Sequence, residues 1–302
     1  MEVIRNGTHY DGTAVALGNF DGLHVAHMTI IRNCIDYANN NGLKSGILLF
    51  DENTKYLTQG EIKLITPNRL KLELLEQEQL DFAYMEKFDE DFMKKSPEEF
   101  IRYLVNKLHI KAVCVGYDYS FGYKAQGDVP LLKEYGQKYG FEVLVTDAVK
   151  IDGRIVASTY IRELVQSGRI QDAAHFLGRG YCIEGKVGEG KQNGRKMGVR
   201  TANVDYTDNM ALPCDGVYAG VTYVRERAYK SVINIGKNPT FNARERTIES
   251  HILGFSGDIY DEYVRVCFLK RLRDTVKFDS VEKLLEQINK DIETVKNMEV
   301  EI

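Results

Sequence analysis

A short segment near the start of the chain carries residue types suited to phosphate chemistry. The sequence GNFDGLHVAH (residues 18–27) follows an apolar run and opens a stretch with helical spacing. Gly18 and Gly22 allow a ligand to approach the backbone closely, and a helix start offers unpaired N–H groups to a phosphate. His24 and His27 lie three residues apart on one face of the entering turn, where imidazoles can donate hydrogen bonds to phosphate oxygens. The segment therefore predicts a nucleotide site.

The same two histidines have other interpretations. Together with Asp21 they offer three metal-ligating side chains, although His-x-x-His without another ligand nearby is a weak metal signature. They can also be ordinary surface residues. Both alternatives stay open at this point.

A second segment, VASTYIR (residues 156–162), also enters a helix after an apolar run. Ser158 and Thr159 can cap that helix and hydrogen-bond an anion, and Arg162 can bind the anion with its guanidinium group. Taken alone, a Ser-Thr pair at a helix start is usually only a cap. Its position after a strand of the same predicted sheet favours anion binding.

The elements that must hold these segments follow from the apolar pattern. Up to Gly178, short apolar runs alternate with amphipathic stretches, which predicts βαβ units and a mainly parallel sheet. The predicted strands are residues 13–18, 45–50, 81–85, 110–116 and 141–145. The helix signals are a cap and proline at Thr66-Pro67, a capping box at Ser96–Glu99 and a stop at Asn41-Gly42. Such a sheet binds ligands beyond the carboxyl ends of its strands, so the following loops are the candidate site.

After Gly178 the pattern changes to β-branched and aromatic runs with near-alternating polarity. The antiparallel strands that they predict are residues 216–224, 229–236, 247–253 and 262–269. Turn residues separate these runs, as in a small barrel or sandwich. One helix ends the chain, with Asp279 or Ser280 as its cap. Its apolar stripe is formed by Val281, Leu284, Leu285, Ile288, Ile292 and Val295.

Length and composition limit the classes of protein. The 302 residues, 43% hydrophobic and 28% charged, suit two globular domains, residues 1–179 and 180–302, divided at Leu177–Gly180. No apolar run is long enough to span a membrane, and the first twenty residues lack a signal-peptide core. A net charge of −4 gives no basic footprint for nucleic acid. We therefore expect a cytoplasmic protein with small-molecule substrates and with neither a nucleic-acid nor a membrane partner.

Five cysteines are widely scattered, with no C-x-x-C pair: Cys34, Cys114, Cys182, Cys214 and Cys267. An odd, unpatterned set argues against both a disulfide framework and a zinc ribbon. We expect small core side chains in a reducing compartment.

The order of these segments resembles that of prokaryotic bifunctional riboflavin kinase/FAD synthetases, in which an FMN adenylyltransferase module precedes a riboflavin kinase module. The motifs that carry the resemblance are GNFDGLHVAH (18–27), GYDYSFGYKAQGD (116–128), STYIRE (158–163), LGRGY (177–181), GRKMGVRTAN (194–203), LPCDGVYAG (212–220), NIGKNPTF (234–241), IESHILGF (248–255) and LRDTVKFDSVEKLLEQI (272–288). The resemblance covers nearly the whole chain. It implies a Rossmann-like α/β nucleotidyltransferase with a parallel sheet, then a six-stranded antiparallel barrel with a terminal helix.

For the first module the resemblance implies transfer of AMP from ATP to FMN, with release of pyrophosphate and help from Mg²⁺. The ATP- and phosphate-binding residues that it implies are Gly18, Phe20, Asp21, Gly22, Ser158, Thr159 and Arg162, with His24 and His27 as catalytic residues facing the phosphates. Asp118 and Phe121 would border the flavin, and loop packing is the alternative for Phe121. Two positions depart from the family pattern: Ala26 replaces a glycine, and Phe50–Lys55 replaces a Pro-His-Pro element.

For the second module the resemblance implies phosphorylation of the riboflavin 5′-hydroxyl by ATP. Loop glycines would cover the phosphates, or else form a glycine-rich hairpin connection: Gly188, Gly190, Gly194 and Gly198. Thr201 and Asn203 would bind Mg²⁺ through oxygen atoms, and Glu249 would accept the hydroxyl proton. Arg273 would lie in the flavin-binding region. Arg200 replaces a proline here, and Gly254 replaces an aspartate.

The leading hypothesis is therefore an ATP-dependent transferase that makes FMN and then FAD. In one alternative only one module is active, and the adenylyltransferase is favoured. Another is a regulator that binds flavin or nucleotide without turnover, and a third is an unrelated nucleotidyltransferase fused to a β-barrel binding module. A general base, Glu249, beside a metal site favours an enzyme, whereas Ala26 and Arg200 keep the alternatives open.

Overall fold

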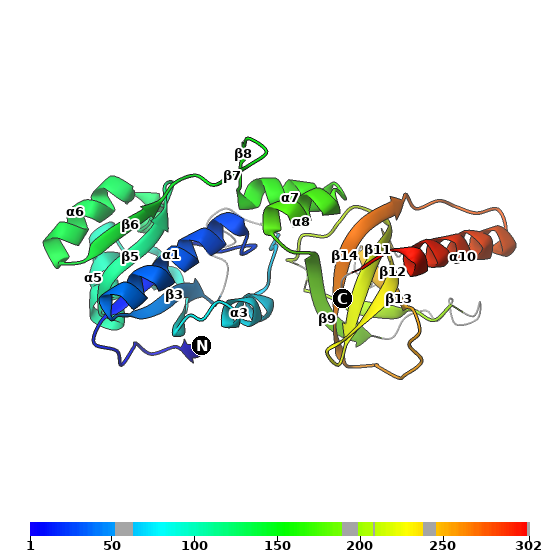
Figure 1. Ribbon diagram of the computed structural model, residues 1–302, viewed down its shortest axis with the longest axis horizontal. Coiled ribbons are helices and arrows are strands. Elements are labelled where there is room, and N and C mark those ends of the chain that lie inside the picture. Colours follow the sequence, from blue (N-terminus) through cyan, green and yellow to red (C-terminus); the bar gives the residue numbers. More distant parts are fainter. Residues whose placement is uncertain (52–62, 189–198, 208, 238–245, 301–302) are drawn as a thin grey trace. The chain divides into compact units, whose positions relative to one another are not determined.

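The computed structural model describes residues 1–51, 63–188, 199–207, 209–237 and 246–300. The chain divides into two compact units, Met1–Ser158 and Thr159–Ile302 (Figure 1). Helices α7 (Ser158–Gln166) and α8 (Ile170–Leu177) therefore group with the second unit, whose strands α8 contacts. The predicted seam at Leu177–Gly180 falls directly after these two helices.

The first unit is built on a six-stranded sheet in which every recorded strand pair is parallel. Its strands are β1 (Glu2–Ile4), β2 (Thr13–Ala16), β3 (Lys44–Phe50), β4 (Phe82–Glu86), β5 (Ile110–Gly116) and β6 (Glu142–Thr146), in the order β1-β4-β3-β2-β5-β6. The predicted parallel sheet is confirmed. Strand β1 is additional, because three residues are too few to show a hydrophobic period.

Each face of this sheet has its own core, because successive strand residues point to opposite faces. Helices α1 (Val25–Asn41) and α3 (Asn68–Glu76) cover the face that includes Ala14 and Ala16. Helices α5 (Pro97–Leu108) and α6 (Val129–Tyr139) cover the face that includes Val15. The alternation of small and larger apolar residues in β2 therefore serves two different helix layers.

The carboxyl ends of β2 and β5 form the switch point of the sheet. From β2 the chain continues through β3 and β4 on one side, and it returns to β5 on the other side. Open α/β sheets bind their ligands at such a point. The loop that contains residues 18–24 leaves β2 here, and the loop that contains residues 117–121 leaves β5 here.

Most predicted helix ends are confirmed. Ser96 and Glu99 form a reciprocal capping box at the start of α5, and Gly42 ends α1 in the left-handed conformation with φ of 65°. Ser280 caps the last helix, α10 (Val281–Asn297), by accepting a hydrogen bond from the backbone N–H of Lys283.

The predicted cap at Thr66 is wrong. Helix α3 begins at Asn68, with Pro67 at its N-cap position and no side-chain capping bond. The Thr66 N–H instead donates to the carboxylate of Asp21, which lies far away in the sequence. The helix therefore begins one residue later than predicted, and the Thr66 backbone contacts the β2–α1 loop.

The second unit contains a closed barrel in which the recorded strand pairs are antiparallel (Figure 1). Its strands are β9 (Tyr181–Gly188), β10 (Ala202–Asp205), β11 (Gly216–Val224), β12 (Arg227–Lys237), β13 (Arg246–Ile252) and β14 (Tyr263–Arg273), in the order β10-β13-β12-β11-β14-β9. Helix α10 contacts β12, where Lys230 Nζ donates to the carbonyl oxygens of Lys296 and Met298 at 2.8 and 2.7 Å. The expected six-stranded barrel with a terminal helix is confirmed.

The remaining elements are short. They are α4 (Glu90–Met93), a 3-10 turn at Tyr123–Ala125, and the pair β7 (Lys150–Ile151) and β8 (Arg154–Ile155). Within the described residues, no helix combines the length and the apolar character that crossing a membrane requires.

Two cysteines form a disulfide, which corrects the expectation drawn from their scatter. Cys182 on β9 and Cys267 on β14 are paired in register across neighbouring strands, and their sulfur atoms are bonded. They are 85 residues apart in the sequence, so strand pairing and not spacing brings them together. Cys34 and Cys114 are free, buried thiols as expected, and Cys214 is a half-buried free thiol.

Candidate functional sites

The loop between β2 and α1 is buried and conformationally restrained. Phe20 and Leu23 have φ angles of 47° and 40°, which side-chain-bearing residues seldom adopt, and Gly22 has φ of 96°. Both apolar side chains are almost wholly buried. Unusual backbone of this kind persists only where the surroundings hold it, and it is concentrated at functional sites. The loop is therefore a preformed part of the switch point.

The side chain and backbone of Asp21 join three segments of the first unit. Asp21 is 1% exposed, and its Oδ1 accepts hydrogen bonds from the N–H groups of Ile65 and Thr66 at 2.9 and 3.2 Å. The hydroxyl of Ser158 donates to the Asp21 carbonyl oxygen at 2.8 Å. Asp21 thus holds the loop against the start of α3. In the described part of the chain, no three His, Cys, Asp or Glu side chains are grouped as metal ligands.

His24 and His27 form a stacked pair at the N-terminus of α1. Their ring centroids are 3.5 Å apart with the planes 15° apart, and Phe20 packs edge-on against His27 at 5.2 Å. His24 is the N-cap, and its Nδ1 accepts the His27 N–H at 3.3 Å. Because an accepting Nδ1 carries no proton, the proton of the neutral His24 ring lies on Nε2, which can then donate. His24 is 4% exposed, so it is not an ordinary surface residue.

The predicted pyrophosphate residues fall on either side of the division between the units. Ser158 is the last residue of the first unit and contacts the loop through Asp21. Thr159 and Arg162 follow on α7, in the second unit. Their grouping with the loop stays a prediction.

A buried lysine near Asp21 was not predicted from the sequence. Lys71 lies on α3 and is 6% exposed, and burial lowers the pKa of its ammonium group while the Asp21 carboxylate opposes that effect. Lysine is rarely buried without a partner of opposite charge. In the sequence Lys71 is one polar residue within a helical pattern, so only the packing of α3 reveals its proximity to the loop.

The two predicted flavin neighbours in the loop after β5 have different surroundings. Asp118 is exposed. Phe121 is 5% exposed and packs against Phe100 and Tyr119, with centroids 5.8 Å away in each case. Its backbone exchanges two hydrogen bonds with Gly127, at 3.0 and 2.8 Å. In this structure the Phe121 side chain therefore packs within its loop, as in the alternative to a flavin contact.

The structure describes two positions at which the first unit departs from the family pattern, Ala26 and the segment that begins at Phe50. Ala26 is half-buried in the first turn of α1. At the end of β3, Asp51 Oδ1 accepts the Phe88 N–H at 3.0 Å, and the Asp51 N–H donates to the carbonyl of Glu86 at 2.9 Å. Asp51 thereby ties the end of β3 to the end of β4. Residues 52–55 lie outside the described residues, as do Gly190, Gly194 and Gly198.

The barrel presents a row of polar side chains on its outer face. Asn203 on β10 pairs with Glu249 on β13, and Glu249 pairs in turn with Asn234 on β12. Their strand neighbours, such as Val204 and Ile248, are buried and face the barrel interior. Directly paired residues on one face have Cβ atoms about 4.5–5.5 Å apart. The predicted base and one predicted metal ligand are therefore adjacent, and Asn234 is an addition that the sequence argument missed.

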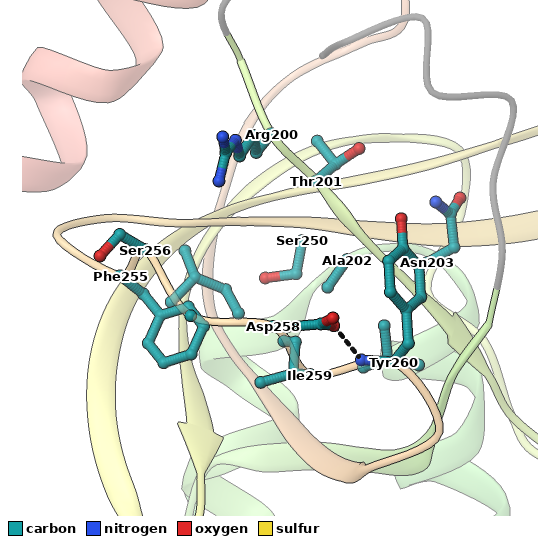
Figure 2. Close-up of a pocket in the computed structure, with 13 residues that line it drawn as sticks. Arg200, Thr201, Ala202, Asn203, Ser250, Phe255, Ser256, Asp258, Ile259 and Tyr260 are labelled. Atoms are coloured by element: carbon teal, nitrogen blue, oxygen red, sulfur yellow. Dashed lines mark hydrogen bonds between the residues drawn. The ribbon is translucent and has the colours of Figure 1, made fainter.

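A pocket of about 310 Å³ opens beside this row (Figure 2). Thr201 and Asn203 are among the residues that line it. The loop after β13 contributes Phe255, Asp258 and Tyr260, and Asp258 Oδ1 accepts the Tyr260 N–H at 3.1 Å. A pocket lined by aromatic and aliphatic residues together with a few polar ones is typical of a small-molecule site.

Two further positions singled out in the second unit are Gly254 and Arg273, and the structure gives the backbone conformation of the first and the contacts of the second. Gly254 has φ of +73°, a left-handed conformation that suits glycine and is tolerated better by aspartate than by most residues. Arg273 forms an ion pair with Asp291 of α10, in which Nη2 and Nε both donate to Oδ2, at 2.8 and 3.0 Å. The Arg273 guanidinium also lies 5.9 Å from the ring of Phe278. The Arg273 side chain thus joins the end of β14 to the terminal helix.

Comparison with known proteins matches the two units in the same order. The family model for FAD synthetase matches residues 7–160, and the family model for riboflavin kinase matches residues 177–299. A bifunctional riboflavin kinase/FMN adenylyltransferase of Haemophilus influenzae is 34% identical over 305 residues, which cover 98% of both chains. One of Escherichia coli is 30% identical over 301 residues, which cover 96% of both.

The fold is also found among solved structures. A crystal structure described as a macrolide-efflux protein of Streptococcus pneumoniae has a TM-score of 0.89 and 29% identity, covering 99% of this chain and 100% of its own. Both family models and the full-length relatives agree on the assignment. The chain therefore belongs to the family of bifunctional riboflavin kinase/FMN adenylyltransferases.

Proposed function

We propose that this protein phosphorylates riboflavin to FMN in its second unit and adenylylates FMN to FAD in its first. The observation that supports this most strongly is that each unit carries polar groups of its own, suited to one of the two reactions. The first has a stacked histidine pair at a helix N-terminus, and the second has a carboxylate beside oxygen ligands. The substrates are small molecules, ATP and flavins, and we place the reactions in the cytoplasm.

In the first unit, an oxygen of the FMN phosphate attacks the α-phosphorus of ATP, and the bond from this phosphorus to pyrophosphate breaks. The Nε2–H of His24, together with His27, donates to phosphate oxygens whose negative charge grows in the transition state. Ser158, whose hydroxyl donates to the Asp21 carbonyl oxygen of the loop, is the residue of this unit that we place at the departing pyrophosphate. No covalent enzyme intermediate is needed, so catalysis consists of orientation and charge neutralisation.

In the second unit, the riboflavin 5′-oxygen attacks the γ-phosphorus of ATP while Glu249 accepts its proton, and ADP leaves. The position of Glu249 beside Asn203 supports this role, because the base must lie next to the bound phosphates. We place the riboflavin ring near Arg273 and, in the first unit, the FMN ring near Asp118.

The oxygen atoms of the second site fit a magnesium ion. Thr201 and Asn203 both line the pocket, and their side chains carry a hydroxyl and an amide oxygen. Mg²⁺ takes few protein oxygens together with phosphate and water. Thr201 and Asn203 would hold the ion at the edge of the pocket. When bound, Mg²⁺ would neutralise charge on the ATP phosphates.

The test is to incubate the purified protein with ATP, Mg²⁺ and riboflavin, then separately with FMN, and to resolve the flavins chromatographically. FMN followed by FAD is the expected result. FAD formed only from supplied FMN would mean that the adenylyltransferase is active and the kinase is not. Flavin binding without either product would favour a regulator, and neither binding nor product would overturn the proposal.

Two variants assign the reactions to their units. His24→Asn keeps an N-cap acceptor but removes Nε2–H, so we expect FAD formation from FMN to fall about 100-fold or more, with FMN formation unchanged. Glu249→Gln is expected to reduce FMN formation about 100-fold or more, with FAD formation from supplied FMN unchanged. The opposite pattern would refute the assignment.

A further inference from the structure

His251 contacts the backbone next to the proposed magnesium ligands. It follows Glu249 by two residues on β13, so both side chains lie on the outer face of the barrel while Ser250 between them is buried. The Nδ1 atom of His251 is 2.6 Å from the carbonyl oxygen of Arg200. A carbonyl oxygen only accepts hydrogen bonds, so Nδ1 carries the proton and donates.

This bond holds the chain at a place where strand pairing does not. The ladder between β10 and β13 begins with Ala202 opposite Ser250, so Arg200 and Thr201 precede the paired residues. Arg200 and Thr201 both border the pocket (Figure 2). The peptide that the His251 bond anchors is therefore the peptide that connects Arg200 to Thr201.

We propose that His251 is a positioning residue for the phosphoryl transfer. By holding the Arg200 carbonyl, it fixes the backbone from which the Thr201 hydroxyl reaches the magnesium ion and the nucleotide. This role rests on the proposed kinase function of the second unit and extends it to a residue that does not itself touch the substrates. Groups that orient metal ligands in this way typically change metal affinity or activity by about 10–100-fold when they are replaced.

Two polar substitutions separate positioning from general stability. His251→Asn places an amide N–H near the position of Nδ1, whereas His251→Gln places its amide near the position of Nε2, one bond farther out. We measure binding of Mg·ADP by calorimetry and FMN formation as a function of Mg²⁺ concentration. We expect His251→Gln to weaken Mg·ADP binding and to raise the half-saturating Mg²⁺ concentration about 10–100-fold, with His251→Asn within about threefold of wild type.

The first unit and a second histidine provide the controls. His109 Nδ1 makes the same kind of contact with the carbonyl of Tyr10, at 2.7 Å, within the first unit. His109→Gln is expected to leave Mg·ADP binding by the barrel unchanged, and both His251 variants are expected to keep FAD formation from FMN.

The outcomes are distinct from those that test the proposed function. If wild type binds Mg·ADP but phosphorylates no riboflavin, the kinase proposal fails, and the calorimetric comparison still tests the role of His251. Equal binding by wild type and His251→Gln, or equal weakening by both His251 variants, would overturn the positioning role.

Discussion

Helix α10 is attached to the barrel by an ion pair whose contribution can be measured through Asp291→Asn. The Asp291 and Arg273 side chains are 7% and 20% exposed, and their closest atoms, Oδ2 and Nη2, are 2.8 Å apart. Gln287 Nε2 also donates to Asp291 Oδ1 at 2.9 Å. The substitution keeps the shape of the side chain but removes its charge, so it isolates the electrostatic part of the attachment.

The magnitude follows from the burial of the pair. Removing one partner of a buried ion pair costs about 3–5 kcal/mol, because the remaining charge is left without a counterion in a poorly hydrated place. The Arg273 side chain is 20% exposed, and asparagine still accepts a hydrogen bond from the guanidinium group. We therefore expect Asp291→Asn to lower the free energy of opening of α10 by about 2 kcal/mol. Since each 1.4 kcal/mol is a factor of ten, opening of α10 should become about 30-fold more frequent.

Hydrogen exchange measured by mass spectrometry on peptides from residues 281–297 is the assay, because it reports local opening without requiring the whole chain to unfold in one step. The matched control is Glu286→Gln on the same helix. Glu286 and Lys290 form an exposed pair, at 67% and 63% exposure, so solvent screens the pair and its loss should change exchange little. If Asp291→Asn accelerates exchange no more than Glu286→Gln, the ion pair does not hold the helix and the reasoning is refuted.

Three further predictions concern the cores of the two units. Reduction of the Cys182–Cys267 disulfide should destabilise the barrel by up to about 4.5 kcal/mol on the chain-entropy account for a separation of 85 residues, and an unchanged thermal midpoint in dithiothreitol would contradict this. Gly46→Ala should destabilise the first unit by about 1–3 kcal/mol in urea unfolding, because a Cβ there would lie 2.1 Å from the ring of Phe82; a variant as stable as wild type would show that the ring moves freely. Burial lowers the pKa of Lys71, so on raising the pH the folded chain loses this proton before the unfolded chain does, and stability should rise between the lowered pKa and the ordinary value of 10.5. Lys71→Met should remove that contribution, and identical pH dependence in the variant and wild type would rule it out.

Local sequence patterns predicted the secondary structure where neighbours in the chain decide it. The run IKAVCVG is strand β5, the residues Ser96 and Glu99 cap α5, and Gly42 ends α1. These predictions succeed because hydrophobic period, capping bonds and left-handed glycine are properties of a few consecutive residues. Thr66 shows the limit. The local signal placed it as the cap of α3, whereas the helix begins at Asn68 and Asp21, from another part of the chain, binds the Thr66 N–H.

The candidate sites divide in the same way. The spacing of His24 and His27 already placed them on one helix turn, and the motif order placed Thr201, Asn203 and Glu249 in one family pattern. The stacking of the two imidazoles, and the alignment of Asn203 with Glu249 and Asn234, appear only in the folded chain.

The sequence by itself therefore determined most of the helices and strands, their order, and the residue types offered to phosphate and metal. The tertiary structure alone decided the disulfide, the burial of Lys71, and the hydrogen bond from His251 to Arg200. The physical reason is that strand register and helix packing bring together residues that are tens of positions apart. No local period or propensity contains that information.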